Sequence, residues 1–409
     1  MKRRVVVTGL GLTSPIGSSL DAVSQALQRG VHGIRTLPEW ASIKDLQTRL
    51  GAPVVGADLE RFSRKQTRTM GRVSLLAAFA TDDAIRDAGL DRSLLSSGRT
   101  GLAYGSTHGS TSAMEQFCRV LFTSGGLTGL SGSSYLKMMS HTCIANLAQC
   151  FEIRGRIVPT ISACVSASQG IGYGYEAIRD GIQDVMLCGG AEELHVLHAG
   201  VFDIMFATST RFNDAPDRSP RPFDKDRDGL VVGEGAGTLV LEDLEHARAR
   251  GAKIHAEIIG YGTNCDGTHV TSPSAEGMAG AMKLALEEAK LAPSKIDYVN
   301  AHGTATELGD IAESQATLAV LGANTPFSST KGFTGHTLGA CGAIEAIFSI
   351  AMMRDGFLAP CRNLEQLDER CAKLDYVMHE ARRAAPKIVM SNNFAFGGIN
   401  TSLILERMA

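Results

Sequence analysis

The nine cysteines of this 409-residue chain include no Cys-x-x-Cys pair, and their number is odd. Scattered, unpaired spacing of this kind argues against a disulfide framework and against a structural zinc site. We therefore expect a reducing, cytoplasmic setting in which most of these thiols are small buried apolar groups. Any cysteine that is given a chemical role needs an argument of its own.

Long apolar runs and an excess of one charge are also missing. No run approaches the ~18–20 apolar residues that span a bilayer, and the apolar stretch after the basic start at residues 1–4 is too short for a secretory signal. The formal net charge is −3, which gives the whole chain no general attraction to nucleic acid. We expect neither membrane insertion nor nucleic-acid binding.

Glycine, by contrast, is plentiful, with 45 residues. Short β-branched runs alternate with helical stretches, and no low-complexity linker separates them. We predict strands at 3–8, 100–104, 184–188 and 237–241, and helices at 20–28 and 71–88. This alternation indicates an α/β protein with a largely buried sheet.

Two segments of the chain resemble each other. Residues 157–181 and 325–356 each run from a strand through a turn into a helix that begins with small residues, and each ends in Arg-Asp-Gly. Residues 4–11 and 256–262 are similar opening strands. Any two βα units share some of this pattern, but together the pairs favour a duplication with two small-residue helices packed together in the centre.

Three patterns that suggest cofactor or metal sites fail on inspection. Gly9-Leu10-Gly11 follows a strand, but Ser14 stands where a dinucleotide fingerprint needs its third glycine. Residues 224–229 resemble the start of a calcium loop, yet Gly235 occupies its twelfth position. His195 and His198 have no third ligand near them in the sequence, so we interpret them as structural.

Four segments carry groups suited to catalysis. Cys164 lies in a turn between an apolar strand and a helix, where the helix dipole favours a thiolate. His302 follows a strand in His-Gly-Thr-Ala-Thr, and His336 precedes the second small-residue helix. Residues 391–398 form a Gly-rich turn that can direct N–H groups at an oxyanion. Each segment alone would more often be structural.

At these four segments, in this order, the sequence resembles the β-ketoacyl-acyl-carrier-protein synthases of the thiolase superfamily. The stretch 221–237 is a further match, and the resemblance covers essentially the whole chain. It implies an α/β, thiolase-like αβαβα layered fold built from two duplicated halves, 1–248 and 249–409. Because His336 replaces the second cysteine of thiolases, the resemblance implies the elongating Cys-His-His type.

The resemblance also implies a role for each matched residue. Cys164 holds the acyl chain, while His302 and His336 donate hydrogen bonds to the enolate formed when malonyl thioester loses CO₂. The backbone N–H groups of Cys164 and Phe396 form an oxyanion hole. The remaining roles are a buried charged network around Lys331 and contacts to the pantetheine arm and the acyl chain. The network would contain Asp310, Glu313 and Glu345, and the contacts would come from Thr304, Thr306, Thr271, His108 and Phe394.

The partners implied are an acyl carrier protein and either a second copy of the chain or a chain-length-factor homologue. No cofactor or metal is expected, because the substrates travel on the phosphopantetheine arm of the carrier. That carrier is acidic, so a basic docking patch is expected. Arg61, Arg64, Lys65, Arg68 and Arg72 recur at helical spacing as one positive stripe, and Arg211 lies in a matching loop. An ordinary solvated helix face would look the same.

Some positions depart from the common family pattern. Ala395 replaces a glycine of the turn at 394–398, Glu307 stands where proline is common, and His108 falls where relatives often place an apolar floor for the acyl chain. These departures resemble the synthases of aryl-polyene pathways and suggest an acyl chain other than a plain saturated one. Two other functions stay open: a non-catalytic chain-length-factor-like subunit and a biosynthetic thiolase.

Overall fold

The main sheet has eleven strands in the computed structural model, which describes residues 2–56 and 61–408. Its first half contains β1 (Val5–Thr13), β4 (Thr100–Gly105), β5 (Ile157–Thr160), β6 (Val185–Glu192) and β8 (Gly235–Asp243). Its second half contains β9 (Ala256–Cys265), β10 (Tyr298–Asn300), β11 (Pro326–Ser328), β13 (Asp375–Tyr376), β15 (Ile388–Ala395) and β16 (Ile399–Glu406). The predicted strands are thus present, with longer bounds.

The two halves of the sheet repeat one pattern. The order β5-β4-β6-β8-β1 in the first half corresponds to β11-β10-β15-β16-β9 in the second. In both, two parallel pairings are followed by two antiparallel ones. A short antiparallel pairing of β1 with β9 joins the halves. This repetition confirms the predicted duplication.

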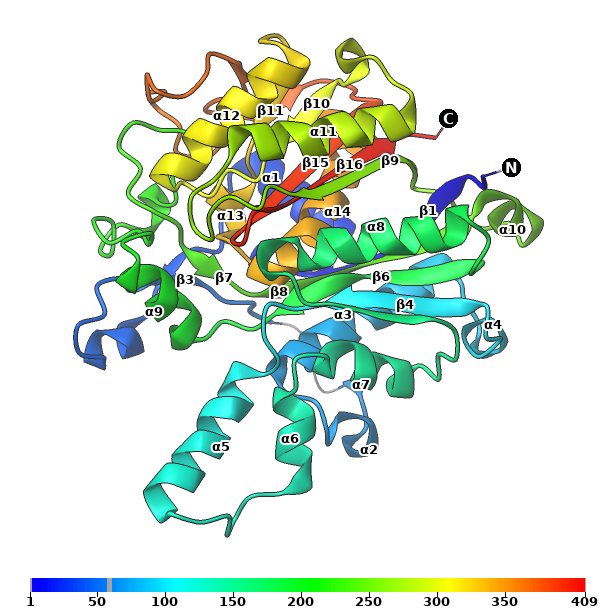
Figure 1. The fold of residues 1–409 in the computed structure, drawn as a ribbon, viewed down its shortest axis with the longest axis vertical. Coiled ribbons are helices and arrows are strands. Elements are labelled where there is room, and N and C mark those ends of the chain that lie inside the picture. The colour runs from blue at the N-terminus through cyan, green and yellow to red at the C-terminus, as the bar shows by residue number, and fades with distance from the viewer. Residues whose placement is uncertain (1, 57–60, 409) are drawn as a thin grey trace.

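Helices and sheet halves form alternating layers (Figure 1). Between the two halves of the sheet lie α8 (Ser166–Arg179) and α14 (Cys341–Asp355), the two small-residue helices of the sequence. The outer faces are covered by α3 (Arg72–Ala88) and α7 (Thr142–Cys150) on one side, and by α11 (Ala275–Ala289) and α12 (Glu307–Leu321) on the other. The order of layers is therefore αβαβα, as predicted.

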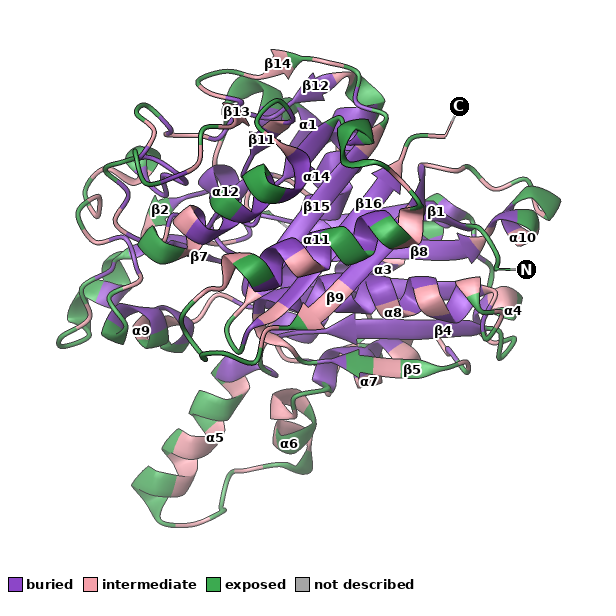
Figure 2. Cartoon of the chain, turned by 45° about the horizontal axis from the view of Figure 1, so that its top comes forward, coloured by how far each residue is buried: buried purple, intermediate pink, exposed green. Residues whose placement is uncertain are grey.

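Burial follows from this layering. Helix α14 is buried along almost its whole length because sheet strands or helices cover every face (Figure 2). Its apolar residues are therefore distributed all round the helix, as expected for a central position. In contrast, α5 (Thr111–Ser124) and α6 (Gly132–Met138) project from the body as an exposed arm (Figure 2).

The remaining elements are short or peripheral. The helices are α1 (Leu20–Arg29), α2 (Arg64–Thr67), α4 (Arg92–Leu95), α9 (Val196–Ile204), α10 (Leu244–Ala249) and α13 (Lys331–Thr334). The strands are β2 (Arg35–Thr36), β3 (Leu50–Ala52), β7 (Val232–Gly233), β12 (Phe357–Leu358) and β14 (Arg382–Arg383). The predicted boundary between residues 248 and 249 falls inside α10 and stays a prediction. Among the described residues, no helix is both long and apolar enough to cross a membrane.

The glycines of β1 serve packing. A Cβ atom at Gly9 would collide with the carbonyl oxygen of Ala84, and one at Gly11 with that of Ala80. Both carbonyls belong to α3, so the missing side chains let helix and strand approach closely. This contact explains the Gly-x-Gly pattern without a dinucleotide.

The carboxyl ends of the parallel strands position the chemistry. Cys164 follows β5 in the first half, and His302 follows β10 in the second, where β10 corresponds to β4. Lys331 and His336 follow β11, and the turn at 394–398 ends β15. Because ligands in α/β sheets bind beyond the carboxyl ends of strands, the four sequence segments are expected to share one site.

Candidate active site

Cys164 lies in a tight bend between strand and helix. After β5, the chain enters a 3₁₀ turn at Ala163–Val165 and continues directly into α8. Ala163 has φ +50°, a left-handed conformation that is unfavourable for a residue with a Cβ atom. The bend places Cys164, which is only 7% exposed, at the start of the central helix.

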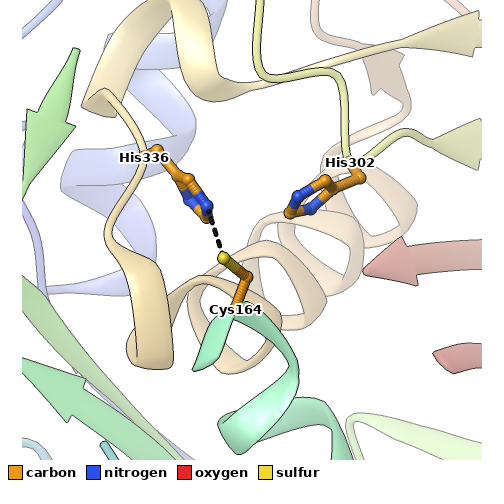
Figure 3. A group of neighbouring side chains, drawn as sticks. All are labelled: Cys164, His302 and His336. Atoms are coloured by element: carbon orange, nitrogen blue, oxygen red, sulfur yellow. Dashed lines mark hydrogen bonds between the residues drawn. The ribbon is translucent and has the colours of Figure 1, made fainter. Parts of the chain in front are cut away.

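The two predicted histidines flank this thiol (Figure 3). His336 Nε2 lies 3.0 Å from the Sγ atom of Cys164. The ring of His302 meets that of His336 edge to face, with centroids 5.1 Å apart. All three side chains are buried. The first half of the chain thus supplies the nucleophile and the second half supplies both imidazoles.

Burial sets the charge of these three groups. It raises the pKa of Cys164 to about 12, although the positive charge of Lys331 and the N–H of Cys164 itself act in the opposite direction. Burial, together with the charge of Lys331, holds the pKa values of His302 and His336 well below the usual range. The expected thiolate is therefore wrong for the free enzyme: the site contains a neutral thiol and two neutral imidazoles.

Lys331 fixes the tautomer of His302. Its Nζ atom lies 3.4 Å from Nδ1 of His302 and pairs with the carboxylate of Glu345. Burial lowers the pKa of Lys331, but the nearby carboxylate of Glu345 outweighs it and raises the pKa above its usual value. An ammonium group can only donate, so Nδ1 of His302 accepts and Nε2 carries the hydrogen.

Glu313 supports the loop that carries His302. Its two carboxylate oxygens accept hydrogen bonds from the backbone N–H groups of His302 and Gly303, each at 2.7 Å. Burial raises the pKa of Glu313 to about 8, while these two N–H groups lower it. Glu313 therefore holds the backbone of the His302 loop. The expected network had placed it beside Lys331 but had not predicted these backbone contacts.

Asp310 belongs to a different ion pair from the one expected. Its carboxylate accepts from the N–H groups of Phe223 and Ala305 and lies 3.5 Å from the guanidinium of Arg227. Burial raises the pKa of Asp310 to about 6, and Arg227 opposes that rise. Of the three acids proposed for Lys331, only Glu345 contacts its ammonium group.

Sequence reasoning missed Arg227, although it noticed the acidic stretch that contains it. The buried guanidinium also bonds the carboxylate of Asp368 at 2.7 Å and the carbonyl of Glu307 at 2.9 Å. Residues 224–229, which resemble the start of a calcium loop, thus support the loop that carries Thr304 and Thr306. The available signal was an arginine among three aspartates, at positions 224, 226 and 228.

A cavity of about 570 Å³ leads to Cys164. Five predicted ligand-binding or oxyanion residues line it: Thr271, Thr304, Thr306, Phe394 and Phe396. The hydroxyls of Thr304 and Thr306 lie 2.9 Å apart, and the Thr271 N–H donates to His269. The cavity therefore offers hydroxyl groups along one wall and the nucleophile at its inner end.

The turn at residues 394–398 closes the β15–β16 hairpin beside this cavity. Ala395 pairs with Ile399 in the ladder and has no positive φ, so the alanine does not strain the turn. The left-handed positions are Gly397 and Gly398, which lack a Cβ atom. The donor role of the Phe396 N–H stays a prediction.

Two of the five cations in the predicted docking stripe are engaged in ion pairs within the protein. Arg61 pairs with Asp82 and Asp83, and Arg72 pairs with Glu234, so these two cations serve the fold. The chain is also not one helix there, because α2 ends before α3 begins. The exposed cations of this stretch are Arg64, Lys65 and Arg68, while Arg211 lies 3.7 Å from Asp228 and is more than half exposed.

His108 does not line the cavity at Cys164. It is exposed, and its ring stacks on that of His198 with centroids 5.0 Å apart. Two groups of side chains in the described part of the chain place three metal-ligating atoms within 4.8 Å of one another: Cys164 with His302 and His336, and His108 with Glu192 and His198. The first group is the catalytic candidate itself.

The comparisons agree with this geometry. The family described as beta-ketoacyl synthase, N-terminal domain, matches residues 2–247, and its C-terminal domain matches residues 255–365. The chain is 39% identical to 3-oxoacyl-(acyl-carrier-protein) synthase 1 of Haemophilus influenzae, with 99% of each covered. It is 39% identical to 3-oxoacyl-(acyl-carrier-protein) synthase 2 of Vibrio cholerae over the full length of both.

Solved structures show the same relationship. A beta-ketoacyl synthase from Burkholderia phymatum is 52% identical, with a TM-score of 0.97 and full coverage of both chains. The ishigamide ketosynthase/chain length factor is 32% identical over both full chains, with a TM-score of 0.92. A ketosynthase in complex with its chain length factor from Xenorhabdus doucetiae is 26% identical, with a TM-score of 0.86 and 99% and 98% coverage.

The relatives named as synthases do not favour a thiolase or a non-catalytic subunit. The layered fold, the Cys164–His302–His336 site and these full-length matches lead to one assignment. The chain belongs to the β-ketoacyl synthase family.

Proposed function

We propose that the chain catalyses the decarboxylative condensation of an acyl thioester with a malonyl thioester on an acyl carrier protein. One observation carries this proposal: a buried thiol, 3.0 Å from one neutral imidazole and beside a second, at the inner end of a cavity. The named relatives are synthases of this kind.

In the first step, the Sγ atom of Cys164 attacks the carbonyl carbon of the acyl thioester. The C–S bond to the carrier breaks, and the thiol proton leaves with the carrier thiol. The products are acyl-Cys164 and free carrier, so no charge is left in the buried site. The Nε2–H group of His336, at hydrogen-bond distance, can donate to Sγ and orient the thiol for this transfer, in the same tautomer that the second step needs.

In the second step, the malonyl carboxylate leaves as CO₂, and its bonding electrons form an enolate on the remaining thioester. His302 and His336 donate hydrogen bonds to the enolate oxygen. The enolate carbon then attacks acyl-Cys164, and the Cys164 sulfur leaves and takes up one proton from solvent. The N–H groups of Cys164 and Phe396 hold the intermediate oxyanion.

The geometry supports the donor role most strongly for His302. Because Lys331 faces Nδ1, the hydrogen is on Nε2 without any positive charge on the ring. A neutral donor stabilises the enolate and does not protonate it, which keeps the carbon nucleophilic. Thr304 and Thr306, with Thr271, are proposed to hold the pantetheine arm in the cavity.

We further propose that the chain works as a dimer, with a second copy or a chain-length-factor homologue. Strand β5 is one edge of the main sheet; Ile157 in this strand and Ile161 just after it are 41% and 43% exposed. An open apolar edge favours pairing with another chain. Two related structures contain a ketosynthase with its chain length factor.

The carrier is proposed to dock on Lys65 and Arg68, with Arg211, because these cations are exposed and an acidic carrier needs a basic surface. A solved complex of a type II acyl-carrier protein with its ketosynthase involves a relative that is 28% identical.

The departures at Ala395 and His108 support an aryl-polyene-like pathway in the cytoplasm, where the nine free cysteines stay reduced.

Replacement of the nucleophile tests the proposal. Cys164→Ala should abolish product formation from acyl and malonyl carriers, while CO₂ release from malonyl carrier continues because both imidazoles remain. Cys118→Ala, a free cysteine on α5, should retain both activities. Condensation by the Cys164→Ala protein would refute the assignment of the nucleophile.

A further inference from the structure

A second buried cysteine lies next to the turn that carries the nucleophile. Cys341 is the first residue of α14, and its Sγ atom lies 3.2 Å from the carbonyl oxygen of Cys164. Its side chain is 2% exposed, and within the described part of the chain the residues that line the cavity include Cys164 but not Cys341. Cys341 therefore contacts the backbone of the nucleophile without reaching the cavity.

Asn393 of β15 joins this cysteine to the charged pair at Lys331. Its Nδ2 atom lies 2.7 Å from Oε2 of Glu345 and 3.5 Å from Sγ of Cys341. The Oε1 atom of the same carboxylate pairs with Lys331, whose Nζ atom lies 3.4 Å from Nδ1 of His302. Asn393 is fully buried, so water does not compete for its amide group.

The hydrogen bonds of this network have a defined direction. The carboxylate of Glu345 can only accept, so the Asn393 atom that faces it is the NH₂ nitrogen. That group has two hydrogens, one for Glu345 and one for the sulfur of Cys341. The carbonyl of Cys164 also only accepts, so the S–H group of Cys341 is the donor to it. Burial and the charge of Glu345 hold the pKa of Cys341 well above its usual value, which keeps the hydrogen on the sulfur.

The turn that carries Cys164 depends on contacts of this kind. Ala163 has φ +50°, a conformation that persists only where the surrounding structure holds it. Within the turn, the N–H group of Ser162 donates to Oγ of Ser166, and that hydroxyl group donates to the carbonyl of Ala163. The bond from Cys341 comes from the second half of the chain and holds the peptide unit that follows Cys164. It therefore helps to set the direction in which the Sγ atom of the nucleophile points.

The other link acts on a donor to the enolate. The position of Lys331 depends on Glu345, the acid that its ammonium group contacts. Glu345 is 2% exposed, so water cannot replace a donor that its carboxylate loses. Without Asn393, the carboxylate of Glu345 can turn, and Lys331 then moves away from Nδ1 of His302.

We propose that Asn393 is a positioning residue for both steps of the condensation, an inference that rests on the proposed function. Through Cys341 it holds the turn that carries Cys164. Through Glu345 and Lys331 it holds the tautomer of the histidine that donates to the enolate. Among the described residues, Asn393 is not one of those that line the cavity, so it acts on the reacting groups and not on the substrate.

The two half-reactions separate the two links. Acylation of Cys164 by an acyl pantetheine thioester, followed by intact mass, reports on the nucleophile. CO₂ release from malonyl carrier in a Cys164→Ala background reports on the donors to the enolate. Asn393→Ala removes both donated hydrogen bonds without adding bulk and should lower each rate about tenfold, because groups on both sides of the site lose their fixed positions.

Replacement of Cys341 should affect one half-reaction alone. Cys341→Ala removes the S–H donor and should lower the acylation rate about threefold, while CO₂ release keeps the parent rate because Asn393 still holds Glu345. Cys341→Ser supplies an O–H donor at the same place and should recover most of the acylation rate. Cys188→Ala, at a fully buried cysteine of β6, is the matched control and should keep both rates.

A double-mutant cycle shows whether Asn393 acts through Lys331. In the Cys164→Ala background, Lys331→Met alone should lower CO₂ release about tenfold or more. Adding Asn393→Ala should then lower the rate little further, because the residue through which it acts is already missing. A role of Asn393 in general stability would not produce this dependence on Lys331.

Three results would overturn the inference. One is an Asn393→Ala protein with the parent rates in both half-reactions. Another is a cycle in which the losses of Asn393→Ala and Lys331→Met multiply. The third is a Cys341→Ala protein that keeps its acylation rate or loses both rates equally.

Two further outcomes are covered by the same set of proteins. If Asn393→Ala does not fold, Asn393→Leu takes its place, since leucine has a similar volume and no donor. If no thioester acylates Cys164 of the parent protein, the proposed function itself fails, whereas normal acylation of the parent with unchanged variants refutes the positioning role alone.

Discussion

At the residue scale, the sequence motifs around Cys164, His302 and His336 were enough to predict that the three side chains share one site, but not their charge. The sequence shows a cysteine at a helix start, which favours a thiolate. Folding adds complete burial, and burial outweighs both the helix and Lys331. Desolvation depends on side chains from both halves of the chain, so no local pattern can reveal it.

The raised pKa of Cys164 predicts how alkylation depends on pH. A thiol with a pKa of about 12 is protonated at neutral pH, and the reactive thiolate increases about tenfold per pH unit below that value. Iodoacetamide should therefore label Cys164 faster at each step from pH 7 to pH 9, without a plateau. Peptide mass mapping gives the rate for each of the nine thiols, and a plateau below pH 8 would contradict the neutral thiol.

Lys331 should control decarboxylation through His302. In a Cys164→Ala background, Lys331→Met removes the donor to Nδ1, so His302 loses its fixed tautomer. CO₂ release from malonyl carrier should fall about tenfold or more. Lys331→Arg keeps a donor and should retain part of the rate; equal rates for Met and the parent protein would show that Lys331 does not act on His302.

At the scale of elements, the sequence excluded a dinucleotide loop at the glycines of β1 but did not show what these glycines do. They resemble a phosphate-binding loop, but in the fold they lie in mid-strand against α3. Arg227 shows the reverse case, since its role became visible only when Asp368 and the loop at residues 304–307 came together. Contacts between segments that are distant in the sequence determine the roles of these glycines and of Arg227. Local sequence patterns could therefore not reveal either role.

Gly11→Ala should destabilise the fold. Its Cβ atom would meet the carbonyl of Ala80 in α3, a backbone atom that cannot move aside alone. Overpacking of this kind costs about 1–3 kcal/mol in the free energy of unfolding. Gly126→Ala, where no atom lies within 4 Å of the new Cβ, is the control. Urea denaturation of both variants should show a lower midpoint for Gly11→Ala alone.

Replacing Arg227 should leave buried acids without a partner. Arg227→Met removes the cation beside Asp310 and Asp368, and breaking a buried pair in this way costs about 3–5 kcal/mol. The double variant Arg227→Met with Asp310→Asn should recover part of that loss. Thermal unfolding of the two proteins measures the recovery; no recovery would mean that Asp310 is not the acid left uncompensated.

At the scale of the whole molecule, the sequence predicted the layers, the duplication and the joint site. Its alternating strands and small-residue helices are local features that the fold retains. The basic stripe was predicted less well, because Arg61 and Arg72 meet acids from other segments. Surface charge can be counted in a sequence, but only the fold shows which charges are already paired.

The remaining cations predict how carrier docking depends on charge. Lys65→Glu with Arg68→Glu should raise KM for carrier-bound substrates about tenfold and leave rates with a pantetheine thioester unchanged. Lys295→Glu, an exposed lysine in the second half, should have no effect. Docking by charge also predicts that added salt raises KM for the parent protein more than for the double variant; equal salt effects would place the carrier elsewhere.

The central claim is that Cys164 carries the acyl chain and hands it to a decarboxylated malonyl unit. The most direct measurement is the mass of the protein after incubation with acyl carrier, followed by peptide mapping and addition of malonyl carrier. We expect one acyl group, on the peptide that contains Cys164, which disappears as β-ketoacyl carrier and CO₂ form in equal amounts. An acyl group on another residue, or one that malonyl carrier does not remove, would contradict the account.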